Sequence, residues 1–232
     1  MRNKLKKVLI ISLITSIVLY FLGLLTGLRY GSEISNIFES KSNKLVNEIK
    51  KVSNEIDELR VLILSNFLSE ESKCLLLERM LDKTQLLKIE YYKILPSRLE
   101  EYELKENLPP HYLETKASYG ELQLKEWLLV MNLRDCNEKI LPILYFYKPK
   151  CEECVKQGDE MDKMIDFLKE NGFLPFVYTI DITSSTPILP LLKDVYNVSD
   201  APSFIFINKT FPSFTDFETF KLYFYETYEK RE

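Results

Sequence analysis

Two cysteines separated by two glutamates carry the clearest chemistry in the sequence. Cys151-Glu152-Glu153-Cys154 follows an apolar, strand-like run and precedes a helix-like run. Two thiols at this spacing, at the start of a helix, can close a small disulfide ring and open it again. A bridge that spans so few residues constrains little of the chain, so the spacing favours electron exchange over structural stapling.

Charged side chains beside this pair set the expected acidity of its first thiol. The N-terminus of a helix stabilises a thiolate at Cys151, and Lys148 and Lys150 add positive charge. Glu152 and Glu153 oppose this effect with negative charge one and two residues away. We therefore expect a Cys151 thiol less acidic than in strongly oxidising proteins, and a couple that is less oxidising.

The other two cysteines are Cys74 and Cys136. They either form a structural disulfide with each other or remain as buried free thiols, and both alternatives stay open. A structural zinc site is the rival reading, but it needs four ligands, commonly as two pairs. The sequence has one such pair and a single histidine, His111. We therefore expect no metal and no organic cofactor, because a cysteine pair itself carries electrons.

The composition limits the classes of function. The chain has 232 residues, of which 46% are hydrophobic and 28% charged, which suffices for one packed domain with additional elements. The net charge is −4, and no basic stripe with interleaved aromatic residues is present. Nothing therefore points to a nucleic-acid partner.

An apolar run near the N-terminus, residues 8–28, contains no charged residue. As a helix it would be about 31 Å long, enough to cross a hydrocarbon core of about 30 Å. Residues 2–7 are strongly basic and Arg29 alone follows closely, which predicts a cytoplasmic N-terminus. We therefore expect a single-pass protein of the cell membrane, with an extracytoplasmic C-terminal domain. A cleaved signal peptide and a buried core helix are the alternatives, although no small-residue cleavage site follows the run.

Apolar residues at steps of three and four predict helices over about 34–68, about 69–95 and about 121–134. The first carries the apolar seam Ile49, Val52, Ile56, Leu59 and Ile63. A short coiled coil, and hence a homo-oligomer through the helical region, and packing on a neighbouring helix of the same chain both remain open. The second helix begins at Ser69-Glu70-Glu71-Ser72 with a capping hydroxyl, and a loop at 107–110 precedes the third.

From residue 140 the pattern changes to strands that alternate with helices. Strands are predicted at 143–147, 176–182, 204–207 and 210–214, and helices at 155–170, 187–196 and 216–230. This order describes an α/β domain, with a mixed sheet flanked by helices. The expected organisation is a basic stub with a transmembrane helix (1–30), an α-helical stalk or packing region (31–108), and this domain with an N-terminal helical extension (109–232).

The segment from about 141 to 232 resembles the thioredoxin superfamily. The resemblance rests on the cysteine pair directly after strand 143–147, on the strand ending at Asp181-Ile182, and on residues 198–203. The last of these resembles the family's cis-proline loop, and implies that Pro202 lies across from the disulfide. It further implies that the backbone of Ala201 binds the substrate. The chain departs from the family at Lys150, where tryptophan is usual, and at its two glutamates, which leaves substrate and direction open.

The resemblance implies a membrane-tethered thiol–disulfide oxidoreductase that acts on extracytoplasmic protein thiols. Cys151 would attack and Cys154, one helical turn deeper, would resolve the mixed disulfide. A separate redox partner must then reset the couple. The alternative is a non-catalytic thioredoxin-like binding or scaffold protein at the membrane, which the paired glutamates and the missing tryptophan favour.

Overall fold

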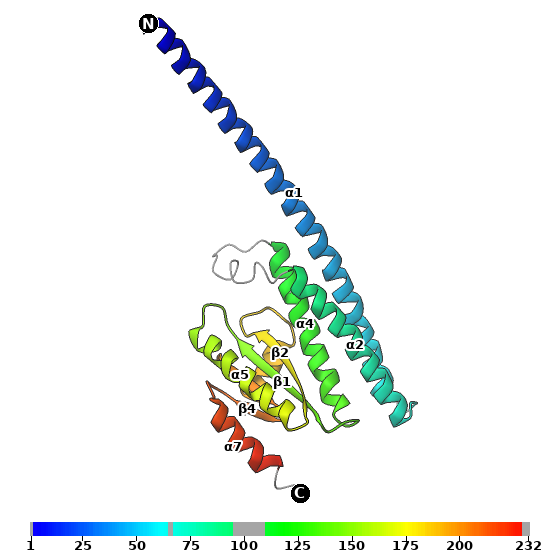
Figure 1. The fold of residues 1–232 in the computed structure, drawn as a ribbon. Coiled ribbons are helices and arrows are strands. Elements are labelled where there is room, and N and C mark those ends of the chain that lie inside the picture. Colours follow the sequence, from blue (N-terminus) through cyan, green and yellow to red (C-terminus); the bar gives the residue numbers. More distant parts are fainter. Residues whose placement is uncertain (1, 65–66, 95–109, 229–232) are drawn as a thin grey trace. The chain divides into compact units, whose positions relative to one another are not determined.

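The computed structural model describes the backbone of residues 2–64, 67–94 and 110–228, and side chains over 16–26, 39–64, 67–91 and 113–228 (Figure 1). The chain forms two compact units, Met1–Asn43 and Lys44–Glu232. The helices are α1 (Arg2–Leu64), α2 (Glu70–Ile94), α4 (Pro110–Leu133), α5 (Glu152–Glu170), α6 (Leu189–Tyr196) and α7 (Phe217–Tyr228). The strands are β1 (Ile140–Tyr147), β2 (Leu174–Asp181), β3 (Ser203–Phe206) and β4 (Lys209–Phe211).

The first unit is helical, and its described side chains at 16–26 are exposed. Among the described residues, no helix combines the length and the apolar character that crossing a membrane requires. The stretch 16–26 would be about 16 Å long at 1.5 Å per residue, about half of a hydrocarbon core. The predicted transmembrane helix at 8–28 is therefore wrong, and so is the predicted single-pass location at the cell membrane. The side chains of 8–15 and 27–28 lie outside the described set.

The second unit is built on a mixed sheet with strand order β2-β1-β3-β4. β1 and β2 are parallel, from Ile140 opposite Leu174 to Tyr147 opposite Asp181. β3 is antiparallel to both β1 and β4. Central β1 is buried except at its last residue, as expected for a continuous apolar run inside a sheet. From residue 140 on, the order of strands and helices is the one that the sequence predicts.

Helices cover both faces of this sheet. α5 and α7 supply an aromatic-rich core against one face, in which Met164 and Phe220 are fully buried. On the other face α4 lies between the sheet and α2, with Trp127 fully buried (Figure 1). The sheet therefore has a hydrophobic core on each side, which fixes the position of the loops at its ends.

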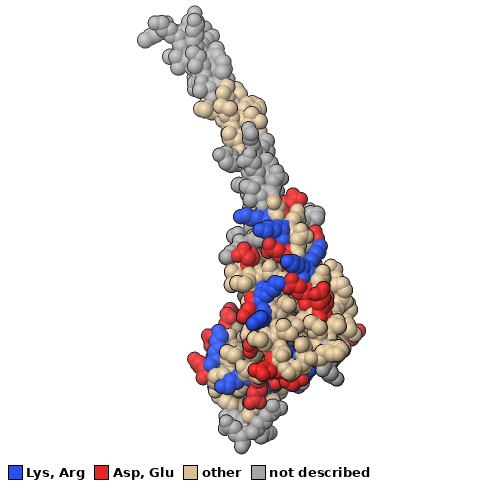
Figure 2. All heavy atoms as spheres, turned by 90° about the vertical axis from the view of Figure 1, so that its right-hand side faces the viewer, with Lys and Arg blue, Asp and Glu red and all other residues tan. Residues whose placement is uncertain are grey.

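The helical layer of the second unit packs within the chain. Residues 44–64 of α1 bury most of the predicted seam, although Ile63 is only partly buried. Lys50 forms an ion pair with Glu114 at 3.0 Å, and Lys125 one with Asp57 at 2.7 Å, so charged pairs join α1 to α4. Figure 2 shows positive and negative side chains interspersed over this layer. Self-association through the helical region stays a prediction.

Two helix starts show how well the local signals work. α2 begins where predicted, and the hydroxyl of Ser69 accepts the N–H of Ser72 at 3.3 Å. α4 begins at Pro110, well before the predicted 121. The prediction treated this proline as part of a loop, but proline is tolerated in the first turn of a helix. The loop predicted at 107–110 is wrong at Pro110, which is the first residue of α4, while 107–109 and the predicted boundary at 108 lie outside the described residues. The boundary at 30 falls inside α1 and stays a prediction about domains.

Candidate functional site

The cysteine pair lies at the N-terminus of α5 and forms a disulfide, with an S–S distance of 2.02 Å. Cys151 is the N-cap residue, and its Sγ accepts the backbone N–H of Cys154 at 3.0 Å. Cys151 is half-buried, whereas Cys154 is only 7% exposed. Cys151 is therefore the sulfur that an external thiol or disulfide reaches first.

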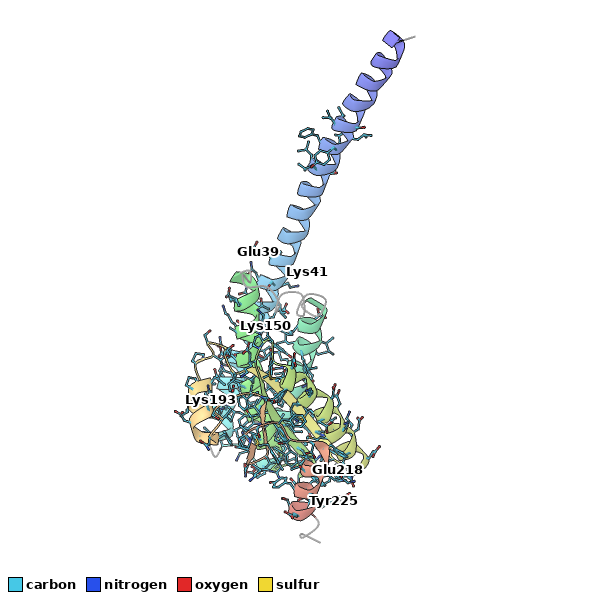
Figure 3. All side chains as sticks on the ribbon, turned by 90° about the vertical axis from the view of Figure 1, so that its left-hand side faces the viewer. Glu39, Lys41, Lys150, Lys193, Glu218 and Tyr225 are labelled. Atoms are coloured by element: carbon cyan, nitrogen blue, oxygen red, sulfur yellow. A yellow bond between two sulfur atoms is a disulfide. The ribbon has the colours of Figure 1, made fainter. Side chains whose placement is uncertain are left out.

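The turn between β1 and α5 sets the direction of this pair. Lys150 has a φ of 56°, in the left-handed region, and is exposed at this end of the second unit (Figure 3). Glu152 and Glu153 occupy the first turn of α5 and point to solvent. Carboxylates at this position stabilise the helix through its dipole, but they oppose negative charge on the Cys151 sulfur.

The loop that contains Pro202 lies at the same end of the sheet. Ser203 pairs with Phe146 near the end of β1, and the Ala201–Pro202 peptide bond is cis. The backbone N–H of Ala201 donates to Oδ1 of Asp200 at 2.8 Å. The structure therefore brings the proline loop and the cysteine turn to the same end of the sheet, and Asp200 accepts the N–H of Ala201.

No protein-family model, curated protein or solved structure matches the chain. The resemblance to the thioredoxin superfamily therefore rests on these residues and their geometry alone.

A surface hollow of about 720 Å³ lies beside the disulfide. Its walls include Tyr145, Tyr147, Thr179 and the exposed side chain of Val155. The hydroxyl of Tyr145 donates to the backbone oxygen of Cys154 at 2.8 Å, and burial raises the pKa of Tyr145 to about 12. Tyr145 therefore remains a donor at neutral pH, and its hydrogen bond holds the first turn of α5 against β1.

A buried ion pair next to this hollow has no counterpart among the predicted site residues. Lys116 of α4 donates to Oδ2 of Asp181 at 2.8 Å, and the two side chains are 14% and 8% exposed. Tyr147 and Thr179 line both the hollow and the small cavity beside this pair. The partners are 65 residues apart in the sequence, so no local pattern could have revealed the contact.

That cavity has a volume of about 80 Å³. The side chain of Gln123 is 1% exposed and lines it, and neither its amide oxygen nor its nitrogen has a hydrogen-bond partner among the described residues. A cavity of this size has room for ordered water, which would satisfy such an amide.

A second polar cluster joins α2, α4 and β2 on the same face of the sheet. Glu126 is buried and accepts a hydrogen bond from Gln85. Burial raises the pKa of Glu126, whereas the nearby Lys88 and the hydroxyl of Tyr178 act to lower it. Burial likewise lowers the pKa of Lys88. These residues hold the helical layer on the sheet and do not contact the cysteine pair.

Cys74 and Cys136 are joined in a second disulfide, with an S–S distance of 2.00 Å. It links α2 to the turn after α4, and Cys136 is exposed. The whole of β1, about 26 Å at 3.3 Å per residue, lies between Cys136 and Cys151 in the chain. The second disulfide is therefore not part of the candidate site. Among the described residues, no group of three or more His, Cys, Asp or Glu side chains is arranged to hold a metal ion.

Proposed function

We propose that the protein exchanges thiols and disulfides with other proteins through Cys151 and Cys154, as a thioredoxin-like oxidoreductase. The observation that carries this proposal is the unequal exposure of the pair at one helix N-terminus. Cys151 is accessible and receives an N–H hydrogen bond, whereas Cys154 is buried behind it. An attacking thiol needs access and thiolate stabilisation, while a resolving thiol needs only to reach its neighbour.

In the reducing direction, the thiolate of Cys151 attacks one sulfur of a substrate disulfide. The substrate S–S bond breaks, the other substrate sulfur leaves as a thiolate, and a mixed disulfide forms. Cys154 then loses its proton and attacks the sulfur of Cys151. This step closes the internal disulfide and releases the second substrate sulfur as a thiolate, so two electrons pass to the substrate. A separate redox partner must reduce the pair again, and the oxidising direction is the reverse.

The hollow beside the pair supports a protein substrate. Its largely apolar wall, with the exposed side chain of Val155, suits the side chains that flank a substrate cysteine. The proline loop borders the same end of the sheet. An extended substrate segment would thus make apolar contacts in the hollow, beside the proline loop.

The test is to trap the mixed disulfide. We expect Cys154→Ala to accumulate mixed disulfides with protein substrates and Cys151→Ala to accumulate none, as seen on non-reducing gels. The double variant Cys74→Ala/Cys136→Ala serves as the control and should keep its turnover of a reference protein disulfide. Trapping by Cys151→Ala in place of Cys154→Ala would reverse the two roles, and trapping by neither would refute exchange.

A thioredoxin-like binding or scaffold protein is the second candidate. It is favoured by the exposed Glu152 and Glu153, which oppose the thiolate, and by Lys148, whose charge is engaged elsewhere. For a protein of this kind, the variant Cys151→Ala/Cys154→Ala would bind the partner as tightly as the unaltered chain does. The unaltered chain would show no measurable turnover of a protein disulfide. Loss of both binding and turnover in that double variant would exclude it.

A further inference from the structure

We propose that a pocket at the far end of the second unit from the cysteine pair binds a small oxyanion of the carboxylate or phosphate class. The pocket has a volume of about 310 Å³. It forms where the end of α4, the turn between β3 and β4, and the C-terminal half of α7 meet. Its polar lining comes from Arg134, Asn208, Lys209, Tyr223 and Thr227.

The charges of this pocket are of one sign. Arg134 and Lys209 are both cationic, and no carboxylate is among the described residues that line the pocket. None of the ion pairs found among the described residues involves either side chain. Two cations on one pocket wall repel each other where the described residues supply no counter-charge, and an anion between them removes that repulsion.

Arg134 also has an unused donor. Its Nε is buried and has no hydrogen-bond partner in the part of the chain that the structure describes. A buried donor on a charged group is costly when it is left unsatisfied. The guanidinium offers a planar fork that matches the two oxygens of a carboxylate or phosphate, and Lys209 adds a mobile point charge.

The backbone at the rim of the pocket is strained. Ile207 has a φ of 57° and occupies the first position of the two-residue loop between β3 and β4. Glycine is the usual residue where a hairpin turn needs positive φ at that position, and a β-branched residue there is unfavourable. Strain of this kind persists where it places ligand-binding groups. Here it sets Asn208 and Lys209 on the wall of the pocket, next to Ile207 itself.

The pocket is independent of the proposed exchange site. Ile207 donates its N–H to Pro142, near the start of β1, whereas Cys151 follows the end of that strand. Figure 3 shows Lys150 and the α7 residue Tyr225 at opposite ends of the second unit. The inference therefore stands whether or not the cysteine pair exchanges disulfides.

The test is a titration of the full chain, labelled with ¹⁵N, with inorganic phosphate and separately with malonate. Sodium chloride keeps the ionic strength constant. We expect saturable shifts of the backbone amides of Asn208 and Lys209 with at least one of the two anions. Arg134→Gln should weaken this binding about ten- to a hundredfold, because a hydrogen bond to a charged group is lost. Lys209→Gln should weaken it less.

Lys156→Gln is the matched control, since it makes the same charge change at an exposed position of α5. It should bind like the unaltered chain. Shifts that never saturate with either anion, or equal affinity in Arg134→Gln and Lys156→Gln, would overturn the proposal. If Arg134→Gln does not fold, the anion affinities of Lys209→Gln and Asn208→Ala are compared with that of Lys156→Gln, and equal affinities would overturn the proposal.

Discussion

The ammonium group of Lys148 donates to both carboxylate oxygens of Asp200, at 2.8 Å and 3.0 Å. This contact joins the turn before Cys151 to the loop before Pro202. The hydrogen bond from Lys148 is the main reason that the pKa of Asp200 is lowered, followed by the N–H of Ala201. The positive charge of Lys148 is therefore largely balanced, and it supports a Cys151 thiolate less than its place in the sequence suggests.

Asp200→Asn should make the Cys151 thiol more acidic. Loss of the carboxylate leaves the charge of Lys148 unbalanced near the sulfur, and we expect the pKa of Cys151 to fall. The couple should become correspondingly more oxidising. Thiolate absorbance measures the first effect, and equilibration with glutathione measures the second.

Lys148→Gln is the matched variant and should make the Cys151 thiol less acidic, because it leaves the negative charge of Asp200 without its partner. The unaltered couple should be clearly less oxidising than strong periplasmic oxidants, whose potentials lie near about −120 mV. A potential close to that value would contradict the opposing effect assigned to Glu152 and Glu153.

Removal of the second disulfide should destabilise the fold. Cys74 and Cys136 are 62 residues apart, and the loop-closure relation gives about 4 kcal/mol for a loop of that length. We expect Cys74→Ala/Cys136→Ala to lose about 2–4 kcal/mol in the free energy of unfolding, measured with urea. The bridge between Cys151 and Cys154 closes a far shorter loop, so Cys151→Ala/Cys154→Ala should lose less than about 2 kcal/mol in the free energy of unfolding. Equal losses would show that loop length does not set the effect.

Breaking the buried ion pair should be costly. Lys116→Met leaves the carboxylate of Asp181 buried without its cation, and we expect a loss of about 3 kcal/mol in the free energy of unfolding. Lys50→Met breaks an exposed pair and should cost less than about 1 kcal/mol. A double-mutant cycle with Asp181→Asn tests the coupling, and strict additivity would refute a direct interaction.

Stability should depend on pH through Glu126. Burial raises its pKa above the ordinary value of 4.5. Just above pH 4.5 the folded chain keeps a proton that the unfolded chain has lost, so stability falls as the pH rises through the interval between the two pKa values. Glu126→Gln cannot titrate and should gain stability relative to the unaltered chain between pH 4 and pH 7. Urea unfolding at several pH values measures this difference, and a difference independent of pH would contradict it.

The strands and helices after residue 140 follow from the sequence because their patterns are local. β1 is a continuous apolar run, and α5 has an apolar face that starts directly after the cysteine pair. The first turns of α4 are harder to predict, because they begin with Pro110 and bury the polar side chain of Thr115. A periodic pattern of apolar residues includes neither.

The parts of the site that could not be predicted depend on contacts between distant residues. Asp200 comes directly before Ala201, yet its bond to Lys148 spans 52 residues. In the sequence, Lys148 and Lys150 both lie near Cys151, and both charges are expected to stabilise its thiolate. In the fold, Asp200 balances the charge of Lys148. The membrane anchor predicted at 8–28 rested on the hydropathy of the whole run, whereas among the described residues no helix is long and apolar enough to cross a membrane.

The position of β1 between the two disulfides lets one chain hold two separate electron pairs. Sulfur atoms must touch to exchange, and a rigid buried strand of about 26 Å keeps Cys136 away from Cys151. Under the proposed exchange function, reduction of the pair on α5 should therefore leave the other bridge oxidised within the same molecule. One bond would then cycle at each turnover while the other braces the fold, and the two should titrate as independent couples.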